Sequence, residues 1–424
     1  MKSVRMARAV ATFLLLLLWT ACGDYYRPVA YPLTPPQPSP GFSHVAVVIS
    51  GNGTKNPGAS TTIDVSGDSA TSQAKVGIMP VHAALVLNGA RVYVANSLDD
   101  SVSTFSSLSP APVDTISLPT GSAPDFVAST ETTNVYVANF GNGTVSAITT
   151  TNNVVADTIV VGGSPVSMAE LPNTQKLYVA NASTAGGNGS VVSINTIDRS
   201  VNPPIAASTT APWVSPVWVV SRSDSQRVYV LDKGSGFVSA IDPNFDVVEG
   251  TISVGIGADF MVYDPTLDRV YVTNPATNSV MALDASTDAL TALTASVANP
   301  VSVAALLDGT RAYVASAAVS GTPPSQTVSS SVTVLNTTDL SVKTTIPLTS
   351  VPVLCATTIW SELMTAAAAD SSRVYVGNCD AGETAIIQTS DDTLLLELPA
   401  PLGAFTPPAT APPLQNPVFV LAGP

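Results

Sequence analysis

Hydrophobic residues recur along the chain in short consecutive runs rather than at helical spacing. The clearest run is RVYVAN, residues 91–96, where four apolar side chains follow one another without a polar interruption. A strand with one solvent-exposed face alternates polar and apolar residues, whereas a continuously apolar strand is buried on both faces. No segment after residue 22 has sustained helical periodicity. The pattern therefore predicts an all-β protein built from doubly covered strands.

The same strand returns along the chain at a nearly constant interval. Tyr136 and Tyr178 stand 42 residues apart, and so do Tyr271 and Tyr313. A period of this length is typical of the four-stranded blade of a β-propeller. The further copies are NVYVAN (134–139), KLYVAN (176–181), RVYVLD (227–232), RVYVTN (269–274), RAYVAS (311–316) and RVYVGN (373–378).

Each repeat divides into four predicted strands. A segment led by proline comes first, as in SPVSMAEL (164–171), and a turn rich in Asp, Asn or Gly separates it from the tyrosine strand. Turn residues of these types tolerate the positive φ that short hairpins need. A Ser-Val strand follows, as in SVSTF (101–105), and the fourth strand resembles DTIVV (157–161).

The Tyr-Val-x-Asn and Ser-Val strands resemble the YVTN family of β-propeller repeats, which is found in exported bacterial and archaeal proteins. The similarity covers nearly all of residues 44–424, which we take as one propeller domain. The resemblance implies a propeller fold and no specific activity.

The number of blades follows from the two ends of the repeat region. HVAVVISGNGT (44–54) aligns without gaps to NVYVANFGNGT (134–144), so the region begins at a second strand. NPVFVLAG (416–423) resembles a first strand, and residues 416–422 are expected to complete the N-terminal blade and close the ring. This predicts eight blades. The alternative is a ring of seven blades in which one repeat unit is degenerate.

The N-terminal residues have the pattern of an export signal. A basic start and a short apolar run over residues 1–21 precede Cys22, and the arrangement resembles the lipobox of bacterial lipoproteins. The proline-rich residues 22–43 are expected to form a tether from a lipid anchored at Cys22. The predicted location is the cell envelope or cell surface. An ordinary cleaved signal peptide with an incidental cysteine is the alternative.

Composition limits the partners. Apolar residues make up 45% of the chain and charged residues 11%, which argues against disorder. The formal net charge of −14 argues against nucleic acid, because phosphate binding needs basic patches. Cys355 and Cys379 flank the first two strands of one unit, and antiparallel pairing would bring them within disulfide distance. A pair of buried thiols is the alternative.

Candidate chemistry is sparse in this sequence. We find no catalytic or phosphate-binding motif and no cofactor. His82, at the start of a first strand near the channel, is a candidate residue of the ligand face, with an ordinary satisfied strand residue as the favoured alternative. Asp125 and Asp259 begin first strands at the channel mouth, where other units have Val. They form a candidate polar-ligand or cation site, with solvated loop acids as the alternative. The same face is expected to collect Asp99, Asp100, Asp232, Asp380 and Glu383, together with a long loop over residues 317–330.

These features favour a non-catalytic binding or scaffold propeller, a monomeric ring with a protein or glycan partner. Two other classes stay open. One is a propeller enzyme of the lactonase or quinoprotein-dehydrogenase type, and the other is a structural component of envelope assembly.

Overall fold

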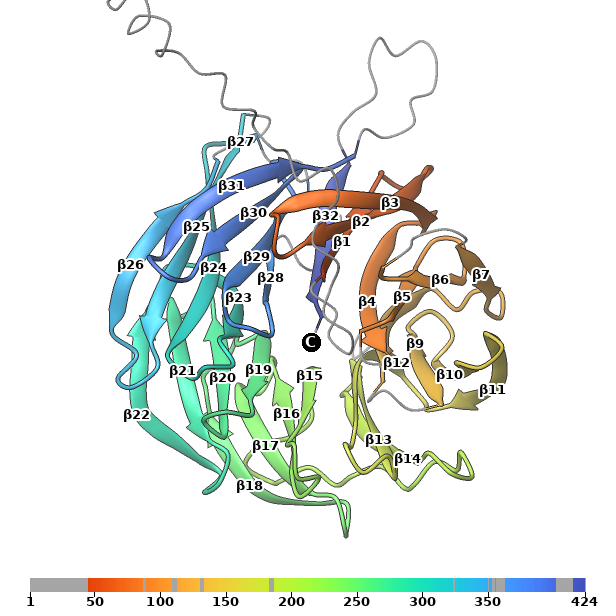
Figure 1. Ribbon diagram of the computed structural model, residues 1–424. Helices are drawn as coiled ribbons and strands as arrows, with labels where there is room; N and C mark the ends of the chain where they lie inside the picture. Colours follow the sequence, from red (N-terminus) through yellow and green to blue (C-terminus); the bar gives the residue numbers. More distant parts are fainter. Residues whose placement is uncertain are drawn as a thin grey trace, which may run out of the picture. The chain divides into compact units, whose positions relative to one another are not determined.

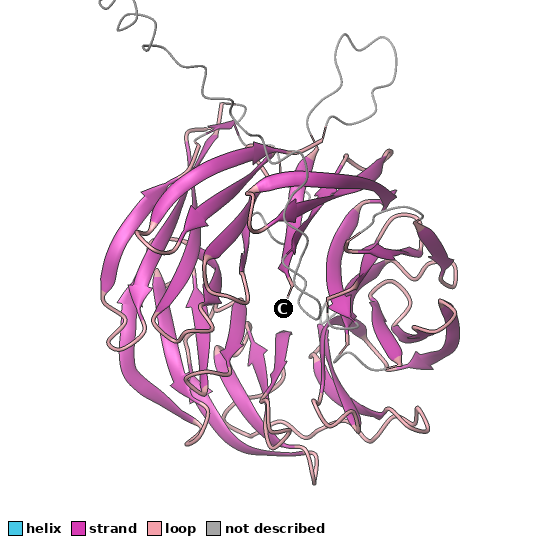
Figure 2. Ribbon diagram, in the orientation of Figure 1, coloured by secondary structure: helices cyan, strands magenta, loops and turns pink. Residues whose placement is uncertain are grey.

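Eight antiparallel sheets stand around a common axis as the blades of a propeller (Figure 1). The computed structural model describes residues 45–86, 89–108, 113–129, 133–182, 187–322, 325–349, 351–352, 355, 363–401 and 415–423. All regular elements of this part are strands (Figure 2). Within it, no helix is long and apolar enough to cross a membrane. The predicted all-β class and the count of eight blades are confirmed, and the seven-blade alternative is wrong.

The strands fall into four concentric sets, numbered from the axis outward. The innermost set is β32 (Asn416–Ala422), β4 (Pro80–Val86), β8 (Pro124–Ala128), β12 (Ser164–Glu170), β15 (Pro216–Ser221), β19 (Phe260–Asp264), β23 (Pro300–Ala305) and β28 (Leu363–Ala367). The second set is β1 (Val45–Gly51), β5 (Arg91–Asn96), β9 (Asn134–Asn139), β13 (Lys176–Ala182), β16 (Val228–Asp232), β20 (Arg269–Asn274), β24 (Arg311–Ser320) and β29 (Arg373–Asn378). The third set is β2 (Pro57–Asp64), β6 (Ser101–Ser106), β10 (Thr144–Thr149), β14 (Ser190–Asn195), β17 (Phe237–Asp242), β21 (Ser279–Asp284), β25 (Thr327–Asn336) and β30 (Glu383–Gln388). The outermost set is β3 (Ser69–Ile78), β7 (Asp114–Ser117), β11 (Val154–Val160), β18 (Val247–Ser253), β22 (Ala289–Ser296), β26 (Val342–Pro347) and β31 (Thr393–Pro399).

Residues 416–422 complete the first blade, as the sequence predicts. β32 pairs antiparallel with β1, placing Val420 opposite Val48 and Phe419 opposite Ile49. In Figure 1 this last strand, in dark blue, lies beside the first one, in red. The pairing removes the open edge that β1 would otherwise present, and open edges invite pairing with other chains.

The tyrosine strands are buried on both faces, as their consecutive apolar residues predict. All seven tyrosines of these strands have an exposed fraction of 0%. The asparagine that ends a typical strand holds the next turn. In β5, Asn96 Nδ2 donates to Ser101 Oγ and to Ser103 Oγ, both at 3.0 Å.

Pairs of neighbouring blades are joined by what we call a clamp. In the clearest case, Tyr229 Oη lies 2.7 Å from Asp288 Oδ1 and Arg227 Nε lies 2.8 Å from Asp288 Oδ2. Asp288 lies in the β21–β22 turn of the next blade, with a φ of 52°. The other acids in this turn position that bind the preceding blade's basic residue are Asp68, Asp246 and Asp392.

Two blades depart from four plain strands. In the blade of β12, β13 and β14, Pro203 and Pro204 lack the N–H groups that a regular fourth strand needs. Only isolated bonds, such as Ile205 N to Val191 O at 2.9 Å, join this segment to β14. In the other blade, β27 (Val351–Pro352) pairs with β25 as a fifth strand. The predicted long loop over 317–330 is mostly strand, because β24 and β25 stay paired out to Ser320 and Thr327.

Candidate functional site

A repeated β-bulge shapes the wall of the channel mouth. In β8, Pro124 pairs with Asn139 and Phe126 pairs with Ala138, so Asp125 is an extra residue in the ladder. A bulge re-aims a side chain that a regular strand would leave in register. The same shift occurs in six innermost strands, and the extra residues are Val81, Asp125, Val166, Val217, Val301 and Val418.

The bulged residues surround a cavity of about 460 Å³. Five of them line it, as does Asp259, the residue before Phe260 at the start of β19. Met364 of β28 also lines the cavity, and it pairs with Gly377 in the way that His82 pairs with Ala95. Loop residues such as Phe140 and Lys233 complete the rim. These loops join second to third strands, so the cavity lies on the face that the sequence predicts for a ligand.

The residues one place further along the innermost strands form what we call the aromatic arc. His82 stacks on Phe126 with ring centroids 3.9 Å apart, and Trp218 meets Phe126 edge-on at 5.8 Å. All members of the arc line the cavity. They are Phe419, His82, Phe126, Trp218 and Phe260, in order around the ring.

His82 is held neutral within the arc. Val127 N donates to His82 Nδ1 at 3.3 Å across the blade boundary, which leaves the ring hydrogen on Nε2. Burial lowers the pKa of His82 to about 3. The ring is therefore uncharged at neutral pH and adds no positive charge to the cavity.

Asp125 is the exceptional acid of the cavity. No described residue gives its carboxylate a hydrogen bond or an ion pair. Its neighbours along the cavity wall are Val81, Phe126 and Val166. Burial in this apolar wall raises the pKa of Asp125 to about 7, because the charged form is poorly solvated.

Asp259 has a protein partner, unlike Asp125. Its Oδ2 lies 3.3 Å from Lys233 Nζ at the rim. Burial raises the pKa of Asp259, and the charge of Lys233 opposes that rise. Lys233 is the one cationic side chain among the described residues that line the cavity.

The other predicted acids do not line the cavity. Asp99, Asp100, Asp232 and Asp380 accept hydrogen bonds from backbone N–H groups, whereas Glu383 Oε2 has no hydrogen-bond partner in the described part. Asp232 accepts the N–H groups of Val214 and Ser235 at 2.7 and 2.8 Å. Asp100 accepts hydrogen bonds from the N–H groups of Gly121 and Ala123, and Asp99 accepts one from the N–H group of Ile78. No group of three or more His, Cys, Asp or Glu residues in the described part could hold a metal ion.

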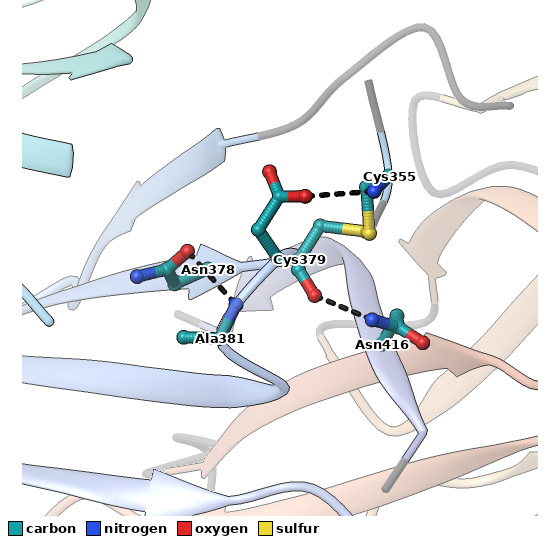
Figure 3. The surroundings of a disulfide bond; sticks show 6 residues. Cys355, Asn378, Cys379, Ala381 and Asn416 are labelled. Atoms are coloured by element: carbon teal, nitrogen blue, oxygen red, sulfur yellow. Dashed lines mark hydrogen bonds between the residues drawn. A yellow bond between two sulfur atoms is a disulfide. The ribbon is translucent and has the colours of Figure 1, made fainter. Parts of the chain in front are cut away.

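Cys355 and Cys379 form a disulfide with a Cα–Cα distance of 6.0 Å, as predicted (Figure 3). Cys355 N donates to Asp380 Oδ1 at 2.7 Å, and Asn416 Nδ2 donates to Cys379 O at 2.6 Å. The bond therefore fastens the segment before β28 close to the start of the closing strand β32. Cys22, the predicted lipidation site, lies outside the described residues, as do residues 1–44.

Most residues of the aromatic arc were not predicted from the sequence. The missed residues share one signal, since Phe126, Trp218 and Phe419 each stand two places after the proline that leads an innermost strand. At the same position of the ladder the other blades have Ser167, Ser302 and Met364. Alignment of the innermost-strand segments would have separated the five ring-bearing blades from these three.

No protein-family model and no curated protein matches the chain. Similar solved structures include dihydro-heme d1 dehydrogenase NirN in complex with DHE, with a TM-score of 0.62 and 10% identity, covering 88% of this chain and 77% of that one. A candidate 6-phosphogluconolactonase from Bacteroides fragilis NCTC 9343 has a TM-score of 0.52 and 13% identity, over 91% and 99% of the two chains. A functionally unknown protein from Desulfotomaculum acetoxidans DSM 771 has a TM-score of 0.51 and 11% identity, over 84% and 95%.

These comparisons contradict the prediction of a non-catalytic binding or scaffold propeller. The similar propellers whose descriptions give an activity are described as enzymes. Identities of 10% and 13% show a shared fold, and the activities named belong to those proteins. What this chain does must be argued from its own cavity.

Proposed function

We propose that the protein is a hydrolase that opens ring esters in the channel-mouth cavity, with Asp125 as the proton-transferring group. The observation that carries this proposal is the carboxyl of Asp125, which lies in an apolar wall, pairs with none of the described residues and has its pKa raised to about 7. An acid or base works best when its pKa lies near the working pH. Such perturbed groups are concentrated in functional sites.

Asp125 supplies both proton transfers that the reaction needs. The ionised carboxylate takes a proton from water while the water oxygen bonds to the ester carbonyl carbon. The ring C–O bond then breaks, and the protonated Asp125 returns that proton to the leaving oxygen. The product is the open hydroxy acid, so one water is consumed and the enzyme is unchanged.

Two neighbours support this chemistry. Lys233 lines the same cavity, and its Nζ can donate a hydrogen bond to the carbonyl oxygen while its charge stays paired with Asp259. His82 stacks on Phe126, the residue next to Asp125, and acts as a positioning residue. We favour hydrolysis over the quinoprotein-dehydrogenase type because proton transfer is the chemistry that a carboxyl of near-neutral pKa supplies.

A panel of lactones tests the proposal at pH 8, where Asp125 is largely ionised. We expect the wild-type protein to hydrolyse at least one lactone. Asp125→Asn should lower the hydrolysis rate by about 100-fold or more, which is the usual contribution of a general acid–base group. Asp339→Asn removes an exposed acid from the β25–β26 turn and serves as the matched control with wild-type rates. Equal rates in Asp125→Asn and wild type would contradict the proposal.

We further propose that the blades are of the YVTN type and that the protein is exported and anchored by lipid at Cys22. The tyrosine strands and the basic and apolar residues before Cys22 support this, and a disulfide fits an oxidising compartment. Labelling of bacteria that express the full chain with radioactive palmitate is the test. Wild type and Cys355→Ser should take up label and Cys22→Ser should not. Label in Cys22→Ser would reject the anchor.

A further inference from the structure

We propose that the substrate of this cavity is an uncharged molecule with a flat conjugated ring, and that the site rejects phosphorylated sugars. This inference rests on the proposed function and narrows its substrate class. The aromatic arc, the charges of the cavity and the size of the cavity support it.

The aromatic arc supplies the surface that a flat ring needs. Five blades place a ring at the same position of their innermost strands, and each ring of the arc touches the next. Phe126 and Trp218 meet at an interplanar angle of 85°, so the arc presents both a ring face and a ring edge. Aromatic pairs prefer offset-stacked and edge-to-face contacts, and both are therefore available to a ring bound here.

The charges of the cavity disfavour an anion. Lys233 is its one cation among the described residues, and its charge is already balanced by Asp259 at 3.3 Å. Asp125 faces the cavity without a balancing cation, and His82 is neutral. The whole chain adds a formal charge of −14. A phosphate group in this site would meet like charges and gain no bidentate arginine partner.

The size of the cavity fits one small ring system. A volume of about 460 Å³ is within the range of roughly 300–1,000 Å³ that is usual for small-molecule sites. Valine side chains form much of the remaining wall, so most of the ligand surface meets apolar atoms. The polar groups are few and belong mainly to Asp125, Asp259 and Lys233.

Binding of two matched probes tests this inference without turnover. 2-Naphthol is a flat neutral ring without an ester, and 2-naphthyl phosphate carries the same ring with negative charge. Titration calorimetry on the full domain at pH 8, where Asp125 is largely ionised, should show binding of the neutral probe and at least tenfold weaker binding of its phosphate ester. Trp218→Leu should weaken the binding of the neutral probe at least tenfold. Trp213→Phe is the control, because Trp213 is buried outside the cavity and donates to Ile205 O.

The outcomes separate this inference from the proposed function. Probe binding that depends on Trp218, without hydrolysis of any lactone, supports the substrate class and rejects the hydrolase. Hydrolysis that depends on Asp125, together with equal binding of both probes or binding unaffected by Trp218→Leu, overturns the substrate class and leaves the hydrolase standing.

Discussion

At the scale of single residues, Asp125 is held in a state that reduces the stability of the folded protein at neutral pH. An unfolded aspartate has a pKa of about 3.9, whereas burial raises the folded value to about 7. Between these two values the folded state binds more protons than the unfolded state. The free energy of unfolding contributed by this group therefore falls as pH rises. Residues that reduce stability in this way are common where function needs them.

We predict that Asp125→Asn stabilises the protein at alkaline pH and hardly changes it at pH 4. The difference in unfolding free energy should grow between about pH 4 and pH 7 and reach at most about 4 kcal/mol above that. Urea unfolding of both proteins across this pH range measures it. The other titrating groups of the cavity, His82, Lys233 and Asp259, are present in both proteins and largely cancel. A difference that is constant with pH would show that Asp125 titrates normally.

Single residues could be placed from the sequence where one blade differs visibly from the others. Asp125 and Asp259 stand where other blades have Val, so their placement beside the channel could be read from the repeat. The lack of a partner for Asp125 depends on which side chains surround it after folding. The roles of Asp99, Asp100 and Asp232 in holding loop N–H groups were not evident either, because backbone donors leave no sequence signal.

At the scale of elements, the tyrosine strand does more than fill the space between blades. In three blades its hydroxyl and the basic residue two places earlier both bind the clamp acid of the next blade, as in Tyr229, Arg227 and Asp288. The repeat predicted the strand but not the clamp, because the two partners lie about 60 residues apart in different repeats. Among the described residues, the blade that begins with β19 has no clamp to the next blade. In that next blade Leu340, and not an acid, occupies the turn position that Asp288 occupies in its own blade.

We predict that Tyr229→Phe lowers the free energy of unfolding by about 1.5–3 kcal/mol, as expected for a hydrogen bond to a charged group. Tyr375→Phe is the matched control, because Tyr375 is equally buried and its hydroxyl has no hydrogen-bond partner in the described part. Tyr375→Phe should lower the free energy of unfolding by less than about 0.5 kcal/mol. Chemical denaturation of both variants measures the difference, and equal losses would mean that the clamp adds no stability.

At the scale of the whole molecule, the ring and its closure could be predicted from the sequence because each blade corresponds to one repeated sequence unit. The alignment of 44–54 with a second strand and of 416–422 with a first strand fixed the count of eight. The cavity could not be predicted in the same way. It is made by one to four residues from each of eight blades, and its volume depends on how the blades converge.

Function follows the same division. Regular positions build the ring, whereas the bulged residues and the aromatic arc differ from blade to blade and give the channel mouth its chemistry. The central claim is that Asp125 transfers protons in this cavity.

The pH dependence of kcat/KM for hydrolysis of a flat lactone such as dihydrocoumarin, between pH 5 and pH 9, tests this claim most directly. We predict a rate that rises with pH and reaches half its maximum near pH 7, where Asp125 ionises, and a low rate without this inflection in Asp125→Asn. An inflection near pH 7 that persists unchanged in Asp125→Asn, or no enzymatic hydrolysis at any pH, would contradict the account.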